Sequence, residues 1–245
     1  MLYWPKFVLR DMKYIYFSLF SLLFLNSCKE EPPLKYKVII PSHSEDAKLP
    51  VIFFLHGWGG TLNQFIPFVK SEFDDAILIF PQAPFKEGEK GNTWSDMALG
   101  KNVYKENLNQ ADYSRKVLNE FINYILGEYN IDSSNIFICG VSQGAMMTLR
   151  LGLNSPYPAK GLICINGRLP MELFKDSLTK SAIDKIDIYL VNGIEDSIIP
   201  VESGRILAHE LRNRGLHLES HEANCGHSLE RKIIVGVKNW IDTKR

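Results

Sequence analysis

The chain has 245 residues, 45% of them hydrophobic, and shows no low-complexity tract or fixed-period repeat, which indicates one folded domain and excludes a disordered chain or a solenoid. Its 28 lysine and arginine residues equal its 28 aspartate and glutamate residues in number. Net charge therefore provides no field that would attract nucleic acid, and we expect a small-molecule partner.

The first thirty residues have the pattern of an export signal. Basic residues precede an apolar run at residues 15–25, which is shorter than the ~20 residues that cross a bilayer as a helix. The Leu-Asn-Ser-Cys sequence at residues 25–28 resembles a bacterial lipoprotein lipobox, which implies that Cys28 is lipidated. We expect a signal peptide over 1–28, a tether over 29–34, and an exported protein anchored by lipid at the periplasmic or cell-surface face of a membrane. An unlipidated signal peptide or an uncleaved interfacial helix is the alternative.

From residue 35 onward, apolar runs alternate with helical stretches, and several runs are continuous, as in parallel strands that are buried on both faces. We predict strands at residues 35–40, 51–55, 76–80, 136–140, 161–165, 187–191 and 216–221. We predict helices at residues 102–129, 143–153, 202–214 and 229–243. The alternation predicts one α/β domain over 35–245, with a mostly parallel central sheet, helices on both faces, and functional residues just after strands.

The sequence Gly-Val-Ser-Gln-Gly at residues 140–144 fits the G-x-S-x-G pattern of a nucleophile elbow. The pattern alone arises by chance in roughly one chain in twelve of this length. Its context is more specific, because it joins a predicted strand to a predicted helix and its glycines let these elements approach closely around a strained serine. We predict Ser142 as a nucleophile; the alternative is a glycine-rich connection with a capping serine.

A serine hydroxyl is a poor nucleophile at neutral pH, so this prediction requires a base that is oriented by a third group. For a serine on such an elbow, the acid and then the histidine follow along the chain. Asp196 follows the strand predicted at 187–191, with Glu195 as its rival, and His227 lies in the loop that enters the last helix. We predict a triad of Ser142, His227 and one of these two carboxylates, Asp196 or Glu195.

Acyl transfer also requires backbone donors for the negative charge that develops on the carbonyl oxygen. The amide of Gln143, next to the nucleophile, is one candidate. The loop at residues 55–60 follows an early strand, and the amide of Trp58 in this loop is the second. We expect His56, in the same loop, to be structural.

The cysteines beyond Cys28 show no metal-binding spacing and no disulfide framework. Cys139 and Cys164 lie in predicted strands, where a buried, small hydrophobic residue is the first interpretation. Pairing between them stays open if those strands are neighbours.

These segments together resemble the α/β-hydrolase superfamily, and in particular its phospholipase/carboxylesterase branch of small esterases, acyl thioesterases and lysophospholipases. The resemblance spans residues 36–242. It is carried by the oxyanion-loop sequence Leu-His-Gly, the Pro-x-Ala-Pro and Trp-x-Asp segments, the elbow and the acid loop, at residues 55–57, 81–84, 94–96, 140–144 and 192–200. The resemblance implies an α/β-hydrolase fold, a serine esterase that works through an acyl-enzyme, and Asp196 rather than Glu195 as the acid.

Two residues depart from the family pattern. Asn192 stands where a histidine is usual and Trp58 where an aliphatic residue is common, which weakens any transfer of substrate preference. Alternatives to a simple carboxylic ester hydrolase are a carbohydrate-ester (feruloyl or acetyl-xylan) esterase, an acyl thioesterase or lysophospholipase, a prolyl-oligopeptidase-like peptidase, and a non-catalytic surface binding protein. The sequence contains no phosphate loop, metal cluster or dinucleotide fingerprint, so no cofactor and no metal are implied.

The substrate pocket is expected to be shallow. About twenty residues separate the strands at 161–165 and 187–191, which is enough for one helix of roughly 15 Å but not for a large cap. Its walls are then expected from Trp58, Trp94, Met146 and a mobile loop at residues 84–94. We therefore expect a preference for short or accessible acyl esters.

Overall fold

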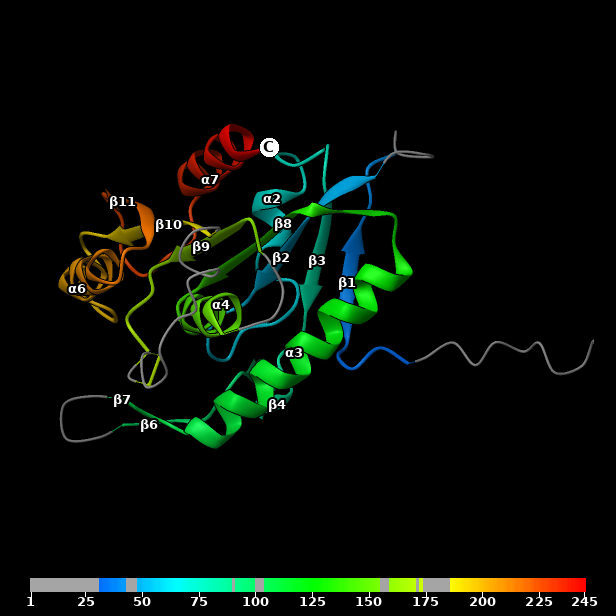
Figure 1. Ribbon diagram of the computed structural model, residues 1–245. Coiled ribbons are helices and arrows are strands. Elements are labelled where there is room, and N and C mark those ends of the chain that lie inside the picture. Colours follow the sequence, from blue (N-terminus) through cyan, green and yellow to red (C-terminus); the bar gives the residue numbers. More distant parts are fainter. Residues whose placement is uncertain are drawn as a thin grey trace, which may run out of the picture. The chain divides into compact units, whose positions relative to one another are not determined.

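Seven strands form the central sheet of the structure, a computed structural model that describes residues 31–42, 48–89, 91–99, 104–154, 159–170, 172–173 and 186–245 (Figure 1). In spatial order they are β1 (Tyr36–Ile39), β3 (Ile77–Pro81), β2 (Leu49–Leu55), β8 (Ile131–Val141), β9 (Gly161–Ile165), β10 (Asp187–Gly193) and β11 (His217–Ala223). β1 pairs antiparallel with β3, and the other neighbouring pairs are parallel, so the mostly parallel sheet is confirmed.

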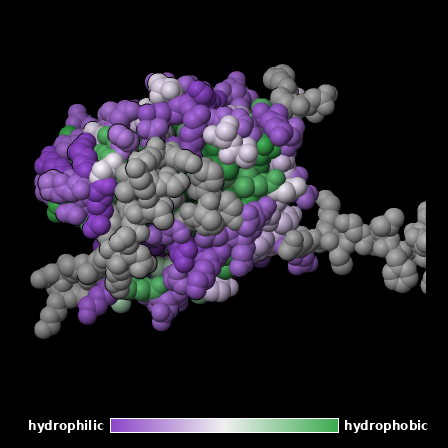
Figure 2. Space-filling model, viewed as in Figure 1, coloured by the Kyte–Doolittle hydropathy of each residue, from purple (hydrophilic) through white to green (hydrophobic). Residues whose placement is uncertain are grey.

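All seven strands belong to a compact unit, Pro33–Arg245. The expected signal peptide, including Cys28, lies outside the described residues. None of the helices that the described residues form combines the length and the hydropathy needed to cross a membrane. Figure 2 shows that hydrophilic residues predominate among the coloured atoms of the face seen in Figure 1, the face on which α3 (Leu108–Glu128) lies; α4 (Gln143–Leu153) is buried along its whole length.

Helices cover both faces of the sheet because successive residues of a strand point to opposite faces. Along β2, Val51, Phe53 and Leu55 pack into one core cluster, whereas Ile52 and Phe54 pack into the other. The first cluster includes residues of α3, α4 and α6 (Val201–Asn213), and the second includes residues of α2 (Ile66–Val69) and α7 (Arg231–Lys244). These five β2 side chains are at most 1% exposed, and burying each contributes roughly 1.5–3 kcal/mol. The expected three layers are confirmed.

The long helix α3 begins at a capping side chain. Asn107 Oδ1 accepts a hydrogen bond from the amide of Gln110 at 3.3 Å, and buried residues recur at helical spacing from there. The sequence predicted this helix from residue 102, and that start is wrong. Tyr104–Glu106 form strand β7, which pairs antiparallel with β6 (Met97–Leu99).

A second hairpin stands where we expected a mobile loop at residues 84–94. It consists of β4 (Phe85–Glu87) and β5 (Gly91–Thr93). The amide of Asn92 donates to the carbonyl of Gly60 at 2.9 Å, which ties the hairpin to the loop after β2. All three β5 residues are buried, so this segment supports the loop after β2.

Candidate active site

Ser142 occupies a sharp turn between β8 and α4. Its backbone has φ 56° and ψ −117°, a conformation that costs a non-glycine residue about 1–3 kcal/mol. The glycines on either side allow this turn: a Cβ at Gly140 would lie 2.2 Å from the Gly144 carbonyl oxygen, and one at Gly144 would lie 2.1 Å from the Leu55 carbonyl oxygen. The amide of Ser142 donates to the carbonyl of Ile165 at 2.8 Å, which fixes the turn against β9.

Ser142, His227 and Asp196 form a continuous hydrogen-bonded chain. Ser142 Oγ lies 3.0 Å from His227 Nε2, and His227 Nδ1 lies 2.6 Å from Asp196 Oδ2. The Asp196 side chain has no exposed surface, and its Oδ1 accepts from the amides of Ile198 and Ile199, each at 2.8 Å. With both carboxylate oxygens occupied as acceptors, Nδ1 of His227 is the donor, and Nε2 is left to accept from the serine hydroxyl.

Glu195, the rival acid, takes no part in this chain of hydrogen bonds. Its backbone amide donates to the carbonyl of Cys225 at 3.0 Å, and the residue is exposed. The turn after β10 thus directs one of two adjacent carboxylates inward and the other outward. Asp196 is the acid that contacts His227.

Gln143, whose backbone amide we expect to face the oxyanion, is held by its side chain. Oε1 accepts from Thr93 Oγ1 at 2.9 Å and from the amide of Trp94 at 3.1 Å, while Nε2 donates to the carbonyl of Ser95 at 2.7 Å. As the first residue of α4, Gln143 has no intrahelical acceptor for its own backbone N–H. That donor is therefore available to a ligand at the N-terminal end of α4, next to Ser142.

The loop after β2, which carries the other expected donor, packs directly against the nucleophile. A Cβ at Gly57 would lie 3.4 Å from the Cβ of Ser142. Trp58 follows at once, and its side chain is 44% exposed beside the same cavity as Ser142. The structure therefore brings the amide-bearing segment expected to bind the oxyanion next to Ser142.

His56 holds this loop in place through both ring nitrogens. Nε2 accepts from the side chain of Gln82 at 2.8 Å and from the amide of Ala83 at 3.0 Å, so Nδ1 is protonated and donates to the carbonyl of Gly57 at 2.8 Å. Burial lowers the pKa of His56 to about 4. His56 is therefore a neutral histidine with a structural role, as expected, and none of its hydrogen bonds involves Ser142.

A cavity of about 370 Å³ opens beside Ser142. Its lining includes Trp58 and Met146, as expected, and also Met97 and Arg168, which sequence reasoning missed. Arg168 follows the strand predicted at 161–165, so the rule that site residues come after strands pointed to its neighbourhood; no sequence signal marked Met97.

Trp94 corrects an expectation, because it does not line this cavity. It is fully buried, and its Nε1 donates to the carbonyl of His56 at 2.8 Å. A buried tryptophan needs an acceptor for this N–H, and the loop after β2 provides it. Trp94 thus supports the loop from behind.

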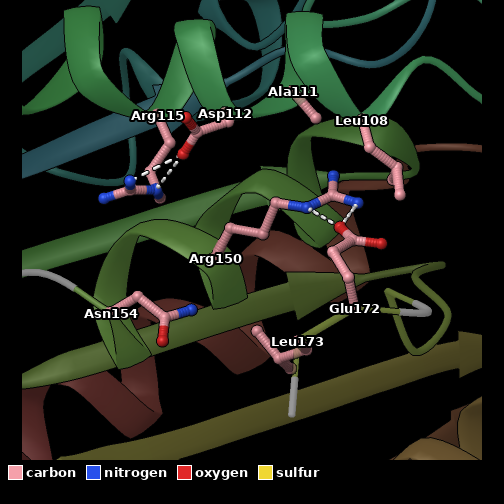
Figure 3. A pocket seen from close by; sticks show the side chains of 8 residues that line it. All are labelled: Leu108, Ala111, Asp112, Arg115, Arg150, Asn154, Glu172 and Leu173. Carbon is pink, nitrogen blue, oxygen red and sulfur yellow. Dashed lines mark hydrogen bonds and ion pairs between the residues drawn. The ribbon is translucent and has the colours of Figure 1, made fainter. Parts of the chain in front are cut away.

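An ionic cluster surrounds Arg150 in the last turn of α4, and Figure 3 shows its pair of Arg150 and Glu172. Arg150 donates to both oxygens of Glu106, at 2.8 and 2.6 Å, and its Nε donates to Glu172 at 2.6 Å. Burial favours the uncharged form of Arg150, but the two carboxylates outweigh it and raise the pKa. Glu106 also accepts from Ser95 Oγ at 2.5 Å, and Ser95 Oγ accepts from Gln143 at 3.1 Å. The cluster is therefore connected to the oxyanion side of the site.

The cysteines of the sheet are free and buried. Cys139 and Cys164 lie on adjacent strands, but they belong to the core clusters on opposite faces of the sheet, which settles the question left open by the sequence. Within the described part of the chain, no three or more His, Cys, Asp or Glu side chains gather closely enough to hold a metal ion.

Residues 34–245 match the family model described as Phospholipase/Carboxylesterase. Carboxylesterase SOBER1 of Arabidopsis thaliana is 27% identical over a match that covers 78% of this chain and 88% of that protein. Acyl-protein thioesterase 1 of Schizosaccharomyces pombe is 32% identical, covering 66% of this chain and 74% of that protein. The solved structure of a Bacillus cereus carboxylesterase has a TM-score of 0.73 at 22% identity, covering 94% of this chain and 99% of that one. The shared fold, without a large cap, confirms the fold expected from the sequence.

Proposed function

Because the chain belongs to the phospholipase/carboxylesterase family of α/β-hydrolases and is a carboxylic ester hydrolase, we propose that it cleaves esters through an acyl-enzyme formed on Ser142. His227 is the general base, and Asp196 orients it. The observation that carries this proposal is the chain of hydrogen bonds from the serine hydroxyl through both nitrogens of His227 to a fully buried carboxylate.

The proposed reaction has two halves. His227 Nε2 takes the hydroxyl proton as Ser142 Oγ attacks the ester carbonyl, and the amides of Gln143 and Trp58 donate to the resulting oxyanion. His227 then gives its proton to the departing alcohol, which leaves the acyl group on the serine. Water repeats the sequence: it loses a proton to His227, attacks the acyl-enzyme, and releases the acid and the free serine. Asp196 stabilises the imidazolium in both halves.

We propose short or accessible acyl esters as substrates. The cavity of about 370 Å³ lies at the small end of ligand pockets, and its lining combines apolar side chains such as Met146 with polar ones. A thioester substrate is the second candidate, favoured by the similarity to a protein named acyl-protein thioesterase 1. Carbohydrate esters, lysophospholipids and peptides are the remaining competitors, and a panel of these substrates distinguishes them.

We also propose that the enzyme acts while anchored to a membrane by lipid on Cys28, at the periplasmic or cell-surface face. The proposal rests on the apolar run and the lipobox-like sequence that ends at Cys28. A flexible tether after Cys28 would let the catalytic domain reach substrates near that surface.

The test of the catalytic proposal uses a fluorophosphonate probe with two matched pairs of variants. Ser142→Ala should lose labelling and lower kcat/KM by about 10⁴-fold or more with circular dichroism unchanged, because such a triad acts as a unit. Asp196→Asn should lower kcat/KM by about 10³- to 10⁴-fold, whereas the exposed neighbour Glu195→Gln should change it by less than about threefold. Near-normal turnover by folded Ser142→Ala would refute the nucleophile, and equal losses at positions 195 and 196 would refute the acid.

A further inference from the structure

Arg168 is the one charged side chain among the described residues that line the cavity beside Ser142. Its neighbours there include the serines at 197 and 203 and the apolar side chains of Trp58 and Met146. No described acidic residue is part of this lining. Among the described lining residues, Arg168 is therefore the only one that presents a full charge to a ligand in the cavity.

The guanidinium of Arg168 has no hydrogen bond or ion pair with any of the described residues. The contrast with Arg150 is direct, because that buried arginine is held by two carboxylates. Arg168 is partly buried, so its five N–H donors are only partly hydrated. A planar donor fork of this kind binds a carboxylate or phosphate through two parallel hydrogen bonds.

The backbone immediately before Arg168 is fixed to the loops of the triad. Asn166 has φ 49° and its side-chain amide donates to the carbonyl of Ser228, next to the catalytic histidine, at 3.1 Å. Asn192 Nδ2 donates to the carbonyl of Gly167 at 3.0 Å. Asn192 is the residue that departs from the family's usual histidine, and here it holds the segment that presents Arg168. An anchored backbone lowers the ordering cost of binding.

We propose that Arg168 determines specificity by binding an anionic group, a carboxylate or a chemically similar oxyanion, on the ester substrate. This inference rests on the proposed function. The hydrolase then prefers esters that carry a negative charge a few bonds from the scissile carbonyl, in either the acyl or the alcohol part. Neutral esters of the same shape leave the guanidinium without a partner.

The test compares kcat/KM for charged and neutral esters of matched shape. The acyl arm uses ethyl hydrogen succinate against ethyl isocaproate, in which an isopropyl group replaces the carboxylate. The alcohol arm uses para-acetoxybenzoate against para-isopropylphenyl acetate. In at least one arm, the ratio of kcat/KM for the charged ester to kcat/KM for the neutral ester should be about tenfold higher in wild type than in Arg168→Gln. A tenfold change corresponds to about one charge-assisted hydrogen bond. This ratio is compared between variants because differences in the intrinsic reactivity of the two esters then cancel.

Two controls separate a binding role from general charge. Arg168→Lys should retain part of the preference, and Arg212→Gln, which removes an exposed arginine from the last turn of α6, should leave the ratio at the wild-type value. Added salt should reduce the wild-type preference and leave that of Arg168→Gln unchanged. The inference would be overturned if Arg168→Gln had the same charged-to-neutral ratio of kcat/KM as wild type in both arms. The proposed function would still stand in that case, provided that wild type hydrolyses the neutral esters. A wild-type protein that hydrolyses no ester of either kind would overturn the proposed function itself.

Discussion

His56 and His227 lie in loops of the same site, and their surroundings give them different chemistry. His56 is 1% exposed and both of its nitrogens are used by the loop around it. His227 keeps 23% of its side chain exposed and has Nε2 directed at Ser142. A base must reach both the nucleophile and the substrate, so the arrangement of hydrogen bonds, and not the residue type, makes His227 rather than His56 the proposed base.

Burial of His56 makes the stability of the protein depend on pH. Its pKa falls from 6.5 to about 4 on folding, so between these values the unfolded chain binds more protons. Stability should therefore be lost as pH falls from about 6.5 to about 4, by about 3 kcal/mol in total from this residue. Urea unfolding of wild type and His56→Gln at several pH values in this window measures it. The variant should lose less stability on acidification; parallel pH profiles would contradict the explanation.

The three residues of the proposed triad were predictable because a local motif and a chain order point to them, and the family resemblance favoured Asp196 over Glu195. The elbow motif identifies Ser142, and the acid and the histidine are expected after later strands, in that order along the chain. Trp94 and Arg168 were not predictable in the same way. A tryptophan beside a site can face substrate or core, and only the contact with His56 decides. The cavity around Arg168 likewise depends on loops that converge from several strands.

At the scale of elements, the two short hairpins, β4–β5 and β6–β7, were not predicted from the sequence. Strands of three residues, as in β4 to β7, are too short to show an alternating pattern, so residues 102–106 read as an extension of the following helix. The hairpin β6–β7 nevertheless supplies Met97 to the cavity and Glu106 to the buried cluster. Apart from the starts of α3 and β8, the longer strands and helices were predicted within about two residues, because apolar runs and helical spacing mark them in the sequence.

The ionic cluster of Glu106, Arg150 and Glu172 fastens that hairpin to α4. Arg150→Met should lower the free energy of unfolding by about 3–5 kcal/mol, because it leaves buried carboxylates without a cation. Arg115 and Asp112 form a more exposed pair nearby (Figure 3), and Arg115→Met should cost less than about 1 kcal/mol. Urea denaturation of both variants provides the comparison. Equal, small losses would show that the cluster is not a major source of stability.

The connection between β9 and β10 bears on substrate length. With residues 166–186 available, a multi-helix cap has no room, so the protein should bury only the first carbons of an acyl chain. We expect kcat/KM for p-nitrophenyl esters to rise over the short acyl chains and then level off, since each methylene gains roughly 0.8 kcal/mol only where it is buried. Measurements from acetate to palmitate, below the aggregation limits, test this. A steady rise beyond about twelve carbons would indicate a long apolar groove instead.

For the whole molecule, the order of strands in the sheet explains why the site is where it is. Ser142, Arg168, Asp196 and His227 follow β8, β9, β10 and β11, which are consecutive neighbours in the sheet. Parallel strands end at the same edge, so residues far apart in sequence meet there. Continuous apolar runs predicted that β8, β9 and β10 are buried, whereas β11 is mostly exposed at the edge of the sheet. These runs did not predict which strand lies beside which, because neighbours are set by tertiary packing.

The location of the whole molecule is tested by one substitution. Cys28→Ala should release the protein from membrane fractions or stall its processing, because an acyl chain contributes about 0.8 kcal/mol of membrane affinity per buried methylene. Fractionation with mass spectrometry of the mature N-terminus measures both effects, and Cys225→Ala, at a free cysteine of the compact unit, is the matched control. A wild-type protein that is soluble and carries no lipid would exclude the anchor.

Ser142 precedes His227 by 85 residues, and the strand that leads to His227, β11, is one of the two edge strands of the sheet. During synthesis the proposed nucleophile therefore emerges long before its proposed base. On the proposed mechanism, a growing chain that ends before β11 has a serine without a proton acceptor and should hydrolyse esters no faster than Ser142→Ala. The appearance of ester cleavage during refolding is then expected only after β11 joins the sheet, so it reports on the docking of this edge strand.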